Sequence, residues 1–258
     1  MKATATWALT RAVLGREIAL FKRYWINSLS GILTTYIMFL MLFFGGQAAV
    51  GDTAIDDSLA GIIVGFFLWS LSFSAFQTPA TAVSDEAQWG TLEQLYMSPF
   101  GLNRVMALKA VADLAIGAIT SILLLVLMMV TSGTFLAFNV GTVSVLVVLT
   151  MCSALGLGLA FGGVAIIYKR ISNVFLLVQF LFLGALAAPP DPQFHLLPLA
   201  FGNDLLRGAM ETGTPLWEIP AADLVFLGTK AAVYLLVGFV VFSACVRKAK
   251  RDGVLGHY

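Results

Sequence analysis

The sequence predicts an all-α polytopic membrane protein, and three features of its composition and patterning support that prediction. Hydrophobic residues make up 59% of the 258 residues, and the mean hydropathy is +0.92. Charged residues make up 11%, whereas a soluble domain usually carries about 25%. Long stretches without any charge recur along the chain. These features exclude an ordinary soluble enzyme, and a net charge of +1 leaves no basic excess for binding nucleic acid.

The first predicted element is an amphipathic helix over about residues 5–25. Charges interrupt every apolar run here, so a signal peptide with a charge-free hydrophobic region is not expected. Apolar side chains recur near helical spacing at Trp7, Leu14, Ile18, Phe21 and Trp25. We favour a helix that lies in the membrane interface, and the alternative is a basic anchor before the first span.

Six membrane spans are predicted, because a helix that crosses a hydrocarbon core of about 30 Å needs about 20 mostly apolar residues. Charge-free windows cover residues 24–51, 58–84, 114–168 and 171–190, and Lys230 alone interrupts 224–246. The third window is too long for one span, and it breaks in the polar stretch from Thr131 to Gly141. The predicted spans are about residues 28–48, 59–80, 107–130, 142–168, 172–188 and 224–246.

The distribution of lysine and arginine predicts that both termini are cytoplasmic. With the N-terminus inside, 13 of the 15 Lys and Arg residues fall on the cytoplasmic side. Arg207 then lies outside, and Lys230 lies within a span. An even number of spans returns the C-terminus to the same side. We therefore expect a multi-pass protein of the cell membrane that forms a single domain over residues 1–258.

The cytoplasmic connection after the second span is predicted to contain a short helix over about residues 86–97. Its Leu92, Leu95 and Tyr96 face one side, and Glu93 and Gln94 face another. A short amphipathic helix on the inner face is suited to a groove on a partner protein. A surface loop without a partner is the alternative, and the residues alone do not choose between them.

The connection before the last span is predicted to be a re-entrant pair of short helices over about residues 189–215, entering from the outer face. Six of the eight prolines fall between Pro189 and Pro220, so the segment is too broken to span. It is also too apolar for a free loop. Non-helical backbone at membrane depth is tolerated only where protein or a water-filled cavity covers it.

These two connections, in this order, resemble the membrane subunit (permease) of ABC-2 type transporters, the exporter class of ATP-binding cassette systems. The first motif consists of Asp85 and Glu86 followed by Gly90-Thr91-Leu92-Glu93-Gln94-Leu95. The second motif consists of Pro198-Leu199-Ala200-Phe201 followed by Asp204-Leu205-Leu206-Arg207-Gly208. The resemblance covers essentially the whole chain, and it departs at Gln88-Trp89, where relatives usually carry more charge.

The resemblance implies that the motor is a separate cytoplasmic ATP-binding cassette subunit, present in two copies, which binds ATP and magnesium. This chain is then expected to hold no cofactor, metal or catalytic residue, and it contains no Gly-x-x-x-x-Gly-Lys-[Ser/Thr] phosphate loop. The residues expected to dock into the ATPase are Asp85, Glu86, Gly90, Thr91, Leu92, Glu93 and Leu95.

The resemblance also implies a second permease subunit, either a second copy or a different chain, and contact with membrane lipid. Relatives move drugs, lipids, lipid-linked glycans and ions. We therefore expect ATP-driven export of a lipophilic, drug-like, lipid or glycan substrate, with multidrug efflux among the options.

Four residues are candidates for a pathway or gating role, namely Lys230, Arg207, Asp204 and Phe73. A cation at the depth of Lys230 costs at least a few kcal/mol unless it pairs or snorkels. It either pairs with Asp204 or Glu211 or snorkels to the outer interface. Phe73 belongs to an aromatic second span that either contacts lipid or stacks on a substrate.

Two further features have a structural and a functional interpretation. Lys109 and Asp113 stand at positions i and i+4. They either form a pair on one helix face or act as a proton or ion relay. The small residues from Gly156 to Gly163 allow close helix packing or mark a flexible point. His195 has no ligand residues at metal-site spacing, so no metal site is expected.

Two other function classes remain as alternatives. An ion-coupled secondary transporter is disfavoured because the spans almost lack carboxylates and show no evident repeat of halves. An intramembrane enzyme is disfavoured because no serine has a histidine base at a recognisable spacing.

Overall fold

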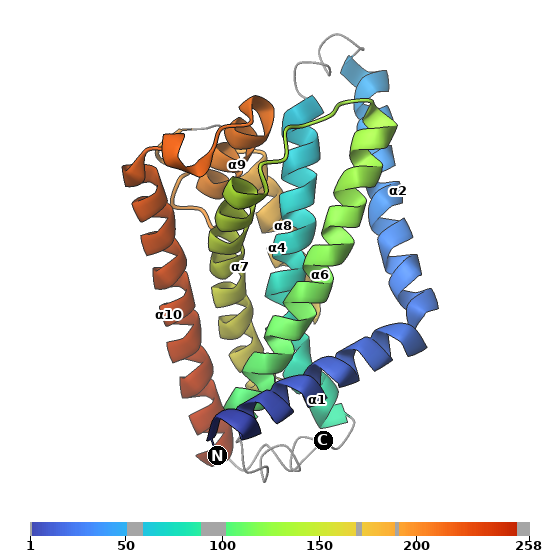
Figure 1. Ribbon diagram of the computed structural model, residues 1–258. Coiled ribbons are helices and arrows are strands. Elements are labelled where there is room, and N and C mark those ends of the chain that lie inside the picture. Colours follow the sequence, from blue (N-terminus) through green and yellow to red (C-terminus); the bar gives the residue numbers. More distant parts are fainter. Residues whose placement is uncertain (1, 51–58, 89–101, 169–171, 189–190, 252–258) are drawn as a thin grey trace.

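A computed structural model describes residues 2–50, 59–88, 102–168, 172–188 and 191–251, and in these ranges the chain is helical without strands (Figure 1). In chain order the elements are α1 (Lys2–Arg23), α2 (Trp25–Val50), α4 (Leu59–Gln88), α6 (Leu102–Ser132), α7 (Val140–Tyr168), α8 (Ser172–Leu186), α9 (Ala200–Thr212), the 3₁₀ turn η1 (Leu216–Glu218) and α10 (Ala221–Arg251). A helix satisfies its own backbone hydrogen bonds, which apolar stretches in lipid require. The predicted all-α class is confirmed for this part of the chain.

Five of the described helices contain a segment long and apolar enough to cross a membrane. These segments are Trp25–Gly46, Leu59–Pro79, Leu108–Ser132, Val140–Ile167 and Ala221–Ala249. The fifth predicted span, 172–188, coincides with α8, which has only 15 residues. At about 1.5 Å per residue, α8 is about 22 Å long, which is less than a hydrocarbon core of about 30 Å. The count of six spans therefore stays a prediction.

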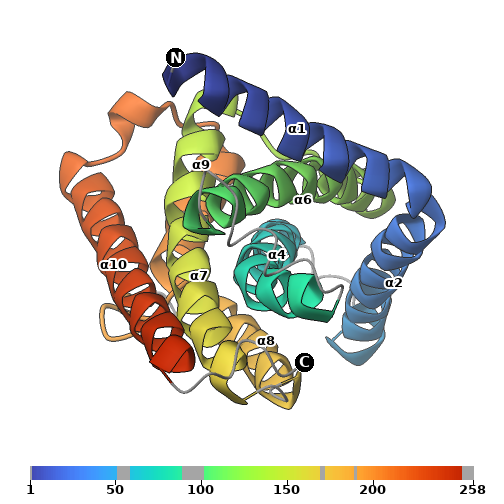
Figure 2. The same cartoon turned by 90° about the horizontal axis from the view of Figure 1, so that it is seen from below.

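Helix α4 lies at the centre of the bundle. Seen from below, α6, α7, α8 and α2 surround it, and α10 lies outside α7 (Figure 2). Helix α1 runs crosswise to the long helices and contacts α6 (Figure 1). We call the end of the bundle that carries α1 the α1 end, and the opposite end the α9 end. The C-terminal end of α10 also lies at the α1 end.

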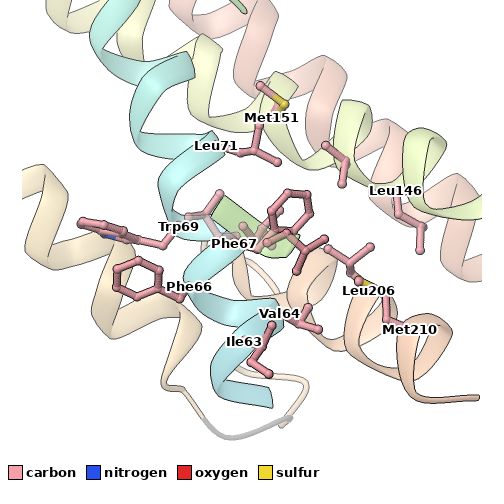
Figure 3. Close-up of a cluster of buried hydrophobic side chains, with 14 of the residues drawn as sticks. Ile63, Val64, Phe66, Phe67, Trp69, Leu71, Leu146, Met151, Leu206 and Met210 are labelled. Carbon is pink, nitrogen blue, oxygen red and sulfur yellow. The ribbon is translucent and has the colours of Figure 1, made fainter. Parts of the chain in front are cut away.

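The buried core forms where α4 faces α7 and α9. Figure 3 shows Phe67 and Leu71 of α4 close to Leu146 and Met151 of α7 and to Leu206 of α9, and all five side chains are buried. In lipid this packing is driven by van der Waals contact between helices, because lipid tails are as apolar as the side chains themselves.

Glycines bring α7 into backbone contact with two neighbours. A Cβ atom added at Gly156 would lie 2.3 Å from the backbone oxygen of Tyr234 on α10. A Cβ atom added at Gly238 would lie 2.0 Å from the backbone oxygen of Gly156. On the other side of α7, a Cβ atom at Gly158 would lie 2.3 Å from the backbone oxygen of Phe76 on α4. The packing interpretation of the run from Gly156 to Gly163 is therefore confirmed.

Helix α4 extends beyond the predicted end of the second span near residue 80. It continues through Pro79 to Gln88. A proline inside a helix removes one backbone hydrogen bond and crowds the preceding turn. Gly158 faces this turn, where an added Cβ atom would lie 2.8 Å from Pro79 Cγ, so the absent side chain gives the proline room. Residues 86–88, assigned above to the coupling helix, form the last turn of α4, and residues 89–97 lie outside the described ranges.

The proline-rich segment also differs from its prediction. Residues 191–199 form turns, and in the described part of 189–215 one α-helix, α9, follows them. This part of the segment therefore does not contain the predicted pair of short helices. Helix α9 begins two residues after Pro198 and ends at Thr212, and it is capped by Gly213, whose φ of 73° is left-handed and favours glycine. The prolines flank α9 and do not interrupt it.

Candidate functional site

Lys230 is the centre of a polar cluster at the α9 end. Its side chain is 7% exposed, although it lies within the α10 span. The Nζ atom donates a hydrogen bond of 2.7 Å to the backbone oxygen of His195, in the turns before α9. Of the two alternatives for Lys230, pairing or snorkelling, this burial favours a partner within the chain. The acceptor of this bond is a backbone oxygen and not the carboxylate of Asp204 or Glu211.

Asp204 of α9 lies beside this bond. Its Oδ2 atom is 3.8 Å from His195 Nε2. Burial raises the pKa of the Asp204 carboxyl above its ordinary value, and the charges of His195, Arg207 and Lys230 oppose that rise. The structure therefore brings Lys230 and Asp204 into one electrostatic cluster through His195, which the sequence did not single out for this role.

Arg207 connects α9 to α4. Its Nε atom donates a hydrogen bond of 2.7 Å to Glu211 Oε1, one turn further along α9. Its guanidinium covers Gly61 of α4, where an added Cβ atom would lie 2.8 Å from Arg207 Cζ. The ion pair contributes little stability, because the two side chains are 43% and 38% exposed.

Two further hydrogen bonds fix α9 and the turns before it. Asn203 is 7% exposed, and its Nδ2 atom donates a bond of 3.4 Å to the backbone oxygen of Leu186 in α8. Its Oδ1 atom has no hydrogen-bond partner among the described residues. The Tyr234 hydroxyl donates a bond of 3.0 Å to the backbone oxygen of Leu196. Sequence reasoning missed Asn203, although an amide between Phe201 and Leu206 is a signal of a specific contact.

The aromatic side chains of α4 mostly pack within the chain. Phe76 makes edge contacts with Phe161, Phe175 and Phe182, at centroid distances between 5.6 and 5.7 Å. Trp69 stacks on Phe73 at 5.9 Å, and Phe73 is the half-buried member of this pair. Of the aromatic residues considered for substrate stacking, Phe73 therefore keeps a partly exposed ring, while the others form the interior.

A second polar contact joins α1 to α6 at the α1 end. Glu17 of α1 and Lys109 of α6 are 7% and 6% exposed. Asp113 interacts electrostatically with Glu17, Lys109 and Arg16, so the predicted pair on one helix face is part of a larger cluster. Sequence reasoning missed this role of Glu17. The available signal was that Glu17 is the one carboxylate residue among the first 51 residues.

The predicted coupling residues lie at the limit of the described ranges. Asp85 and Glu86 belong to the last two turns of α4 at the α1 end. Gly90, Thr91, Leu92, Glu93 and Leu95 lie outside the described residues. Helix α4 thus leads directly from the core into this segment.

The polar groups described above connect helices and turns to one another. No three His, Cys, Asp or Glu side chains gather in a group that could hold a metal ion in the part of the chain the structure describes. A family model for the ABC-2 type transporter matches residues 8–210, from α1 into α9. No curated protein shows a significant match to the chain.

Proposed function

The chain belongs to the ABC-2 type transporter family, and on this premise we propose that it is the permease subunit of an ATP-driven exporter whose ATPase is a separate partner. Membership supports a multi-pass membrane permease, in agreement with the five span-length helices. The observation that carries the proposal is that the family match, over residues 8–210, runs through the core and the segment that follows α4.

The route by which a partner would act on this chain is α4. This helix is continuous from the buried core to Gln88, and it packs against α6, α7, α8 and α9. A displacement applied at the segment after Gln88 would therefore reach every helix in contact with α4. ATP binding to the partner would shift the subunit between two states only if the docked segment binds the partner differently in each.

The finer features of the proposal concern partners and substrate. Two copies of the ATP-binding subunit would dock at the segments containing Glu93, on the cytoplasmic side, where both termini would also lie. A second permease subunit, identical or different, would complete the pathway. The substrate would be lipophilic, drug-like, a lipid or a glycan, with Phe73, Asp204, Arg207 and Lys230 as candidates for its path.

The test is co-purification of the chain with a cognate ATP-binding cassette subunit, followed by ATPase assays on the wild type and on Glu93→Arg. We expect a stable complex whose ATPase rate Glu93→Arg lowers by roughly tenfold, because a reversed charge in a docking interface opposes association. Glu218→Arg is the matched control, because Glu218 is an exposed carboxylate of η1, the turn between α9 and α10.

An absent complex, or an ATPase rate indifferent to Glu93→Arg, would contradict the proposal. An ion-coupled secondary transporter would then be the first alternative. Proton-linked flux through Asp113→Asn and Lys230→Met variants would test that alternative.

A further inference from the structure

An apolar groove lies on the flank of the bundle, separate from the polar cluster around Lys230. It has a volume of about 330 Å³ and lies between α4, α6 and α7. Phe67 and Leu71 of α4 form its floor, Leu114 and Ile122 of α6 form one wall, and Val147 and Met151 of α7 form the other.

The groove exists because α6 and α7 both pack on α4 and have little contact with each other. On the α6 side, Ser70 Oγ donates a hydrogen bond of 3.2 Å to Ser121 Oγ, and a Cβ atom added at Gly117 would lie 2.6 Å from Ser74 Oγ. On the α7 side, Gly158 meets the backbone of α4. These close contacts fix both walls to the floor and leave the space between the walls open.

The rim of the groove is apolar. The floor residues Phe67 and Leu71 are only 2% and 1% exposed. The lining residues Ile122, Phe138 and Val148, in contrast, are 44%, 42% and 58% exposed. A rim this exposed beside a floor this buried describes a slot that opens sideways. A volume of about 330 Å³ is too small for a helix about 10 Å wide that would lie along this wall, whereas a thin flexible chain needs less space.

The length of the groove is close to that of one leaflet of a bilayer. Its α7 wall runs from Val143 to Leu155, which at about 1.5 Å per residue is about 18 Å. That is a little more than half of a hydrocarbon core of about 30 Å. Val143 lies in the first turn of α7, which begins at the α9 end, so the groove begins near that end and stops near the middle of the span.

We propose that this groove is a binding site for one acyl chain of a membrane phospholipid, which resides there as part of the folded subunit. The volume lies within the range of about 300–1,000 Å³ usual for ligand cavities. Protein interiors are close-packed, so an apolar space of this size in a membrane-embedded subunit is filled by the apolar matter beside it. The inference concerns a resident lipid and stands independently of the proposed export function.

The test uses the whole subunit in phosphatidylcholine vesicles that contain a small fraction of phosphatidylcholine with a diazirine in one acyl chain. After illumination, peptide mapping locates the cross-links, and native mass spectrometry counts the phospholipids retained in mild detergent. We expect one retained phospholipid per chain and cross-links concentrated on the groove residues. Free diazirine-labelled fatty acid, added in a second arm, should label the groove less efficiently than the phospholipid.

Two matched pairs of variants locate the site. Ala118→Phe fills the groove, while Ile119→Phe changes the next residue, which is 68% exposed and does not line it. Ser144→Phe fills the groove from α7, with Val145→Phe, 37% exposed and outside the lining, as its control. Each filling variant should lower groove labelling by roughly tenfold and remove the retained lipid, while each control should leave both unchanged. If one filling variant fails to fold, the other still decides.

Three results would overturn the proposal. Labelling spread evenly over the exposed helix faces would indicate only ordinary boundary lipid. Groove residues labelled less than Ile119 would indicate that protein covers the groove, either from a second copy or from a partner. Stronger labelling by the free fatty acid would indicate a fatty-acid site and exclude a phospholipid tail.

Discussion

The central helices of this protein and the pair formed by α1 and α2, which we call the α1–α2 arm, are held by different kinds of contact. In the span segment of α4, 61% of the residues are buried, whereas in that of α2 the share is 11%. Helix α7 meets α4 and α10 backbone to backbone through glycines. Helix α2 contacts the remainder mainly through side chains, such as the hydrogen bond between the Tyr36 and Thr131 hydroxyls and the edge contact of Phe39 with Phe66.

This difference indicates which helices are held in place by contacts within the chain. Helix association in lipid depends on close packing and interhelical hydrogen bonds, because burial of apolar surface gives no gain there. Helix α7 meets α4 and α10 closely through glycines, and side-chain hydrogen bonds join α4 to α6 and α9 to α8. Helix α2 leaves large side chains such as Trp25, Met41 and Phe44 exposed, so it depends on lipid or on another subunit.

The largest expected effect comes from the same substitution made in the two regions. Gly156→Leu places a side chain against the backbone of Tyr234, and overpacking of this kind should cost about 3 kcal/mol or more. Gly31→Leu in α2 meets no atom within 4 Å, and it should change stability by less than about 0.5 kcal/mol. Thermal unfolding in detergent measures both. Equal losses of stability in the two variants would contradict the distinction between the two regions.

The next effect tests how the arm is attached at the α1 end. Lys109→Met leaves the carboxylates of Glu17 and Asp113 without a buried cation, which should cost about 3 kcal/mol at the α1–α6 contact. Combining it with Glu17→Gln should recover part of this loss. Limited proteolysis that reports the release of α1 measures the effect. A neutral Lys109→Met variant would show that the cluster does not hold α1.

A smaller effect tests the polar cluster at the α9 end. Lys230→Met leaves the backbone oxygen of His195 without this donor, which should cost about 1–3 kcal/mol. Tyr234→Phe removes a bond to a more exposed group and should cost about 0.5–1.5 kcal/mol. Hydrogen exchange of residues 191–199 should rise in both variants. Unchanged exchange in Lys230→Met would show that its bond does not fix these turns.

The smallest effect is a pH dependence from Asp204. Burial raises the pKa of this carboxyl above its ordinary value of about 4, so the folded protein keeps the proton to a higher pH than the unfolded chain. Stability should therefore fall as pH rises through the window between the two values. Asp204→Asn should remove this slope and slightly raise Tm at neutral pH, whereas Glu211→Gln should keep the slope. A slope that persists in Asp204→Asn would assign it to another group.

Much of the fold follows from the sequence because lipid imposes a simple rule. A span must be long and almost free of charge, so the windows around α2, α6, α7 and α10 were recognisable from residue order alone. The position of α9 had a weaker signal, since Pro198 and Pro215 leave a clear stretch between them that ends in Gly213.

The remaining features depend on contacts between distant segments. Pro79 remains inside α4 because Gly158, far along the chain, gives it room. Lys230 remains buried because a backbone oxygen accepts a hydrogen bond from it, and the position of a backbone oxygen cannot be read from a residue pattern. The burial of Glu17 requires α1 to lie across α6, which its helical periodicity does not determine.

The most direct test of the proposed function is a transport assay on the purified chain together with its ATP-binding cassette partner. Vesicles that contain the chain together with its ATP-binding cassette partner would be assayed for movement of a lipophilic dye. We predict movement that requires ATP and both subunits and that persists after an ionophore collapses the proton gradient. Movement by this chain alone, driven by a proton gradient without ATP, would contradict the proposed function.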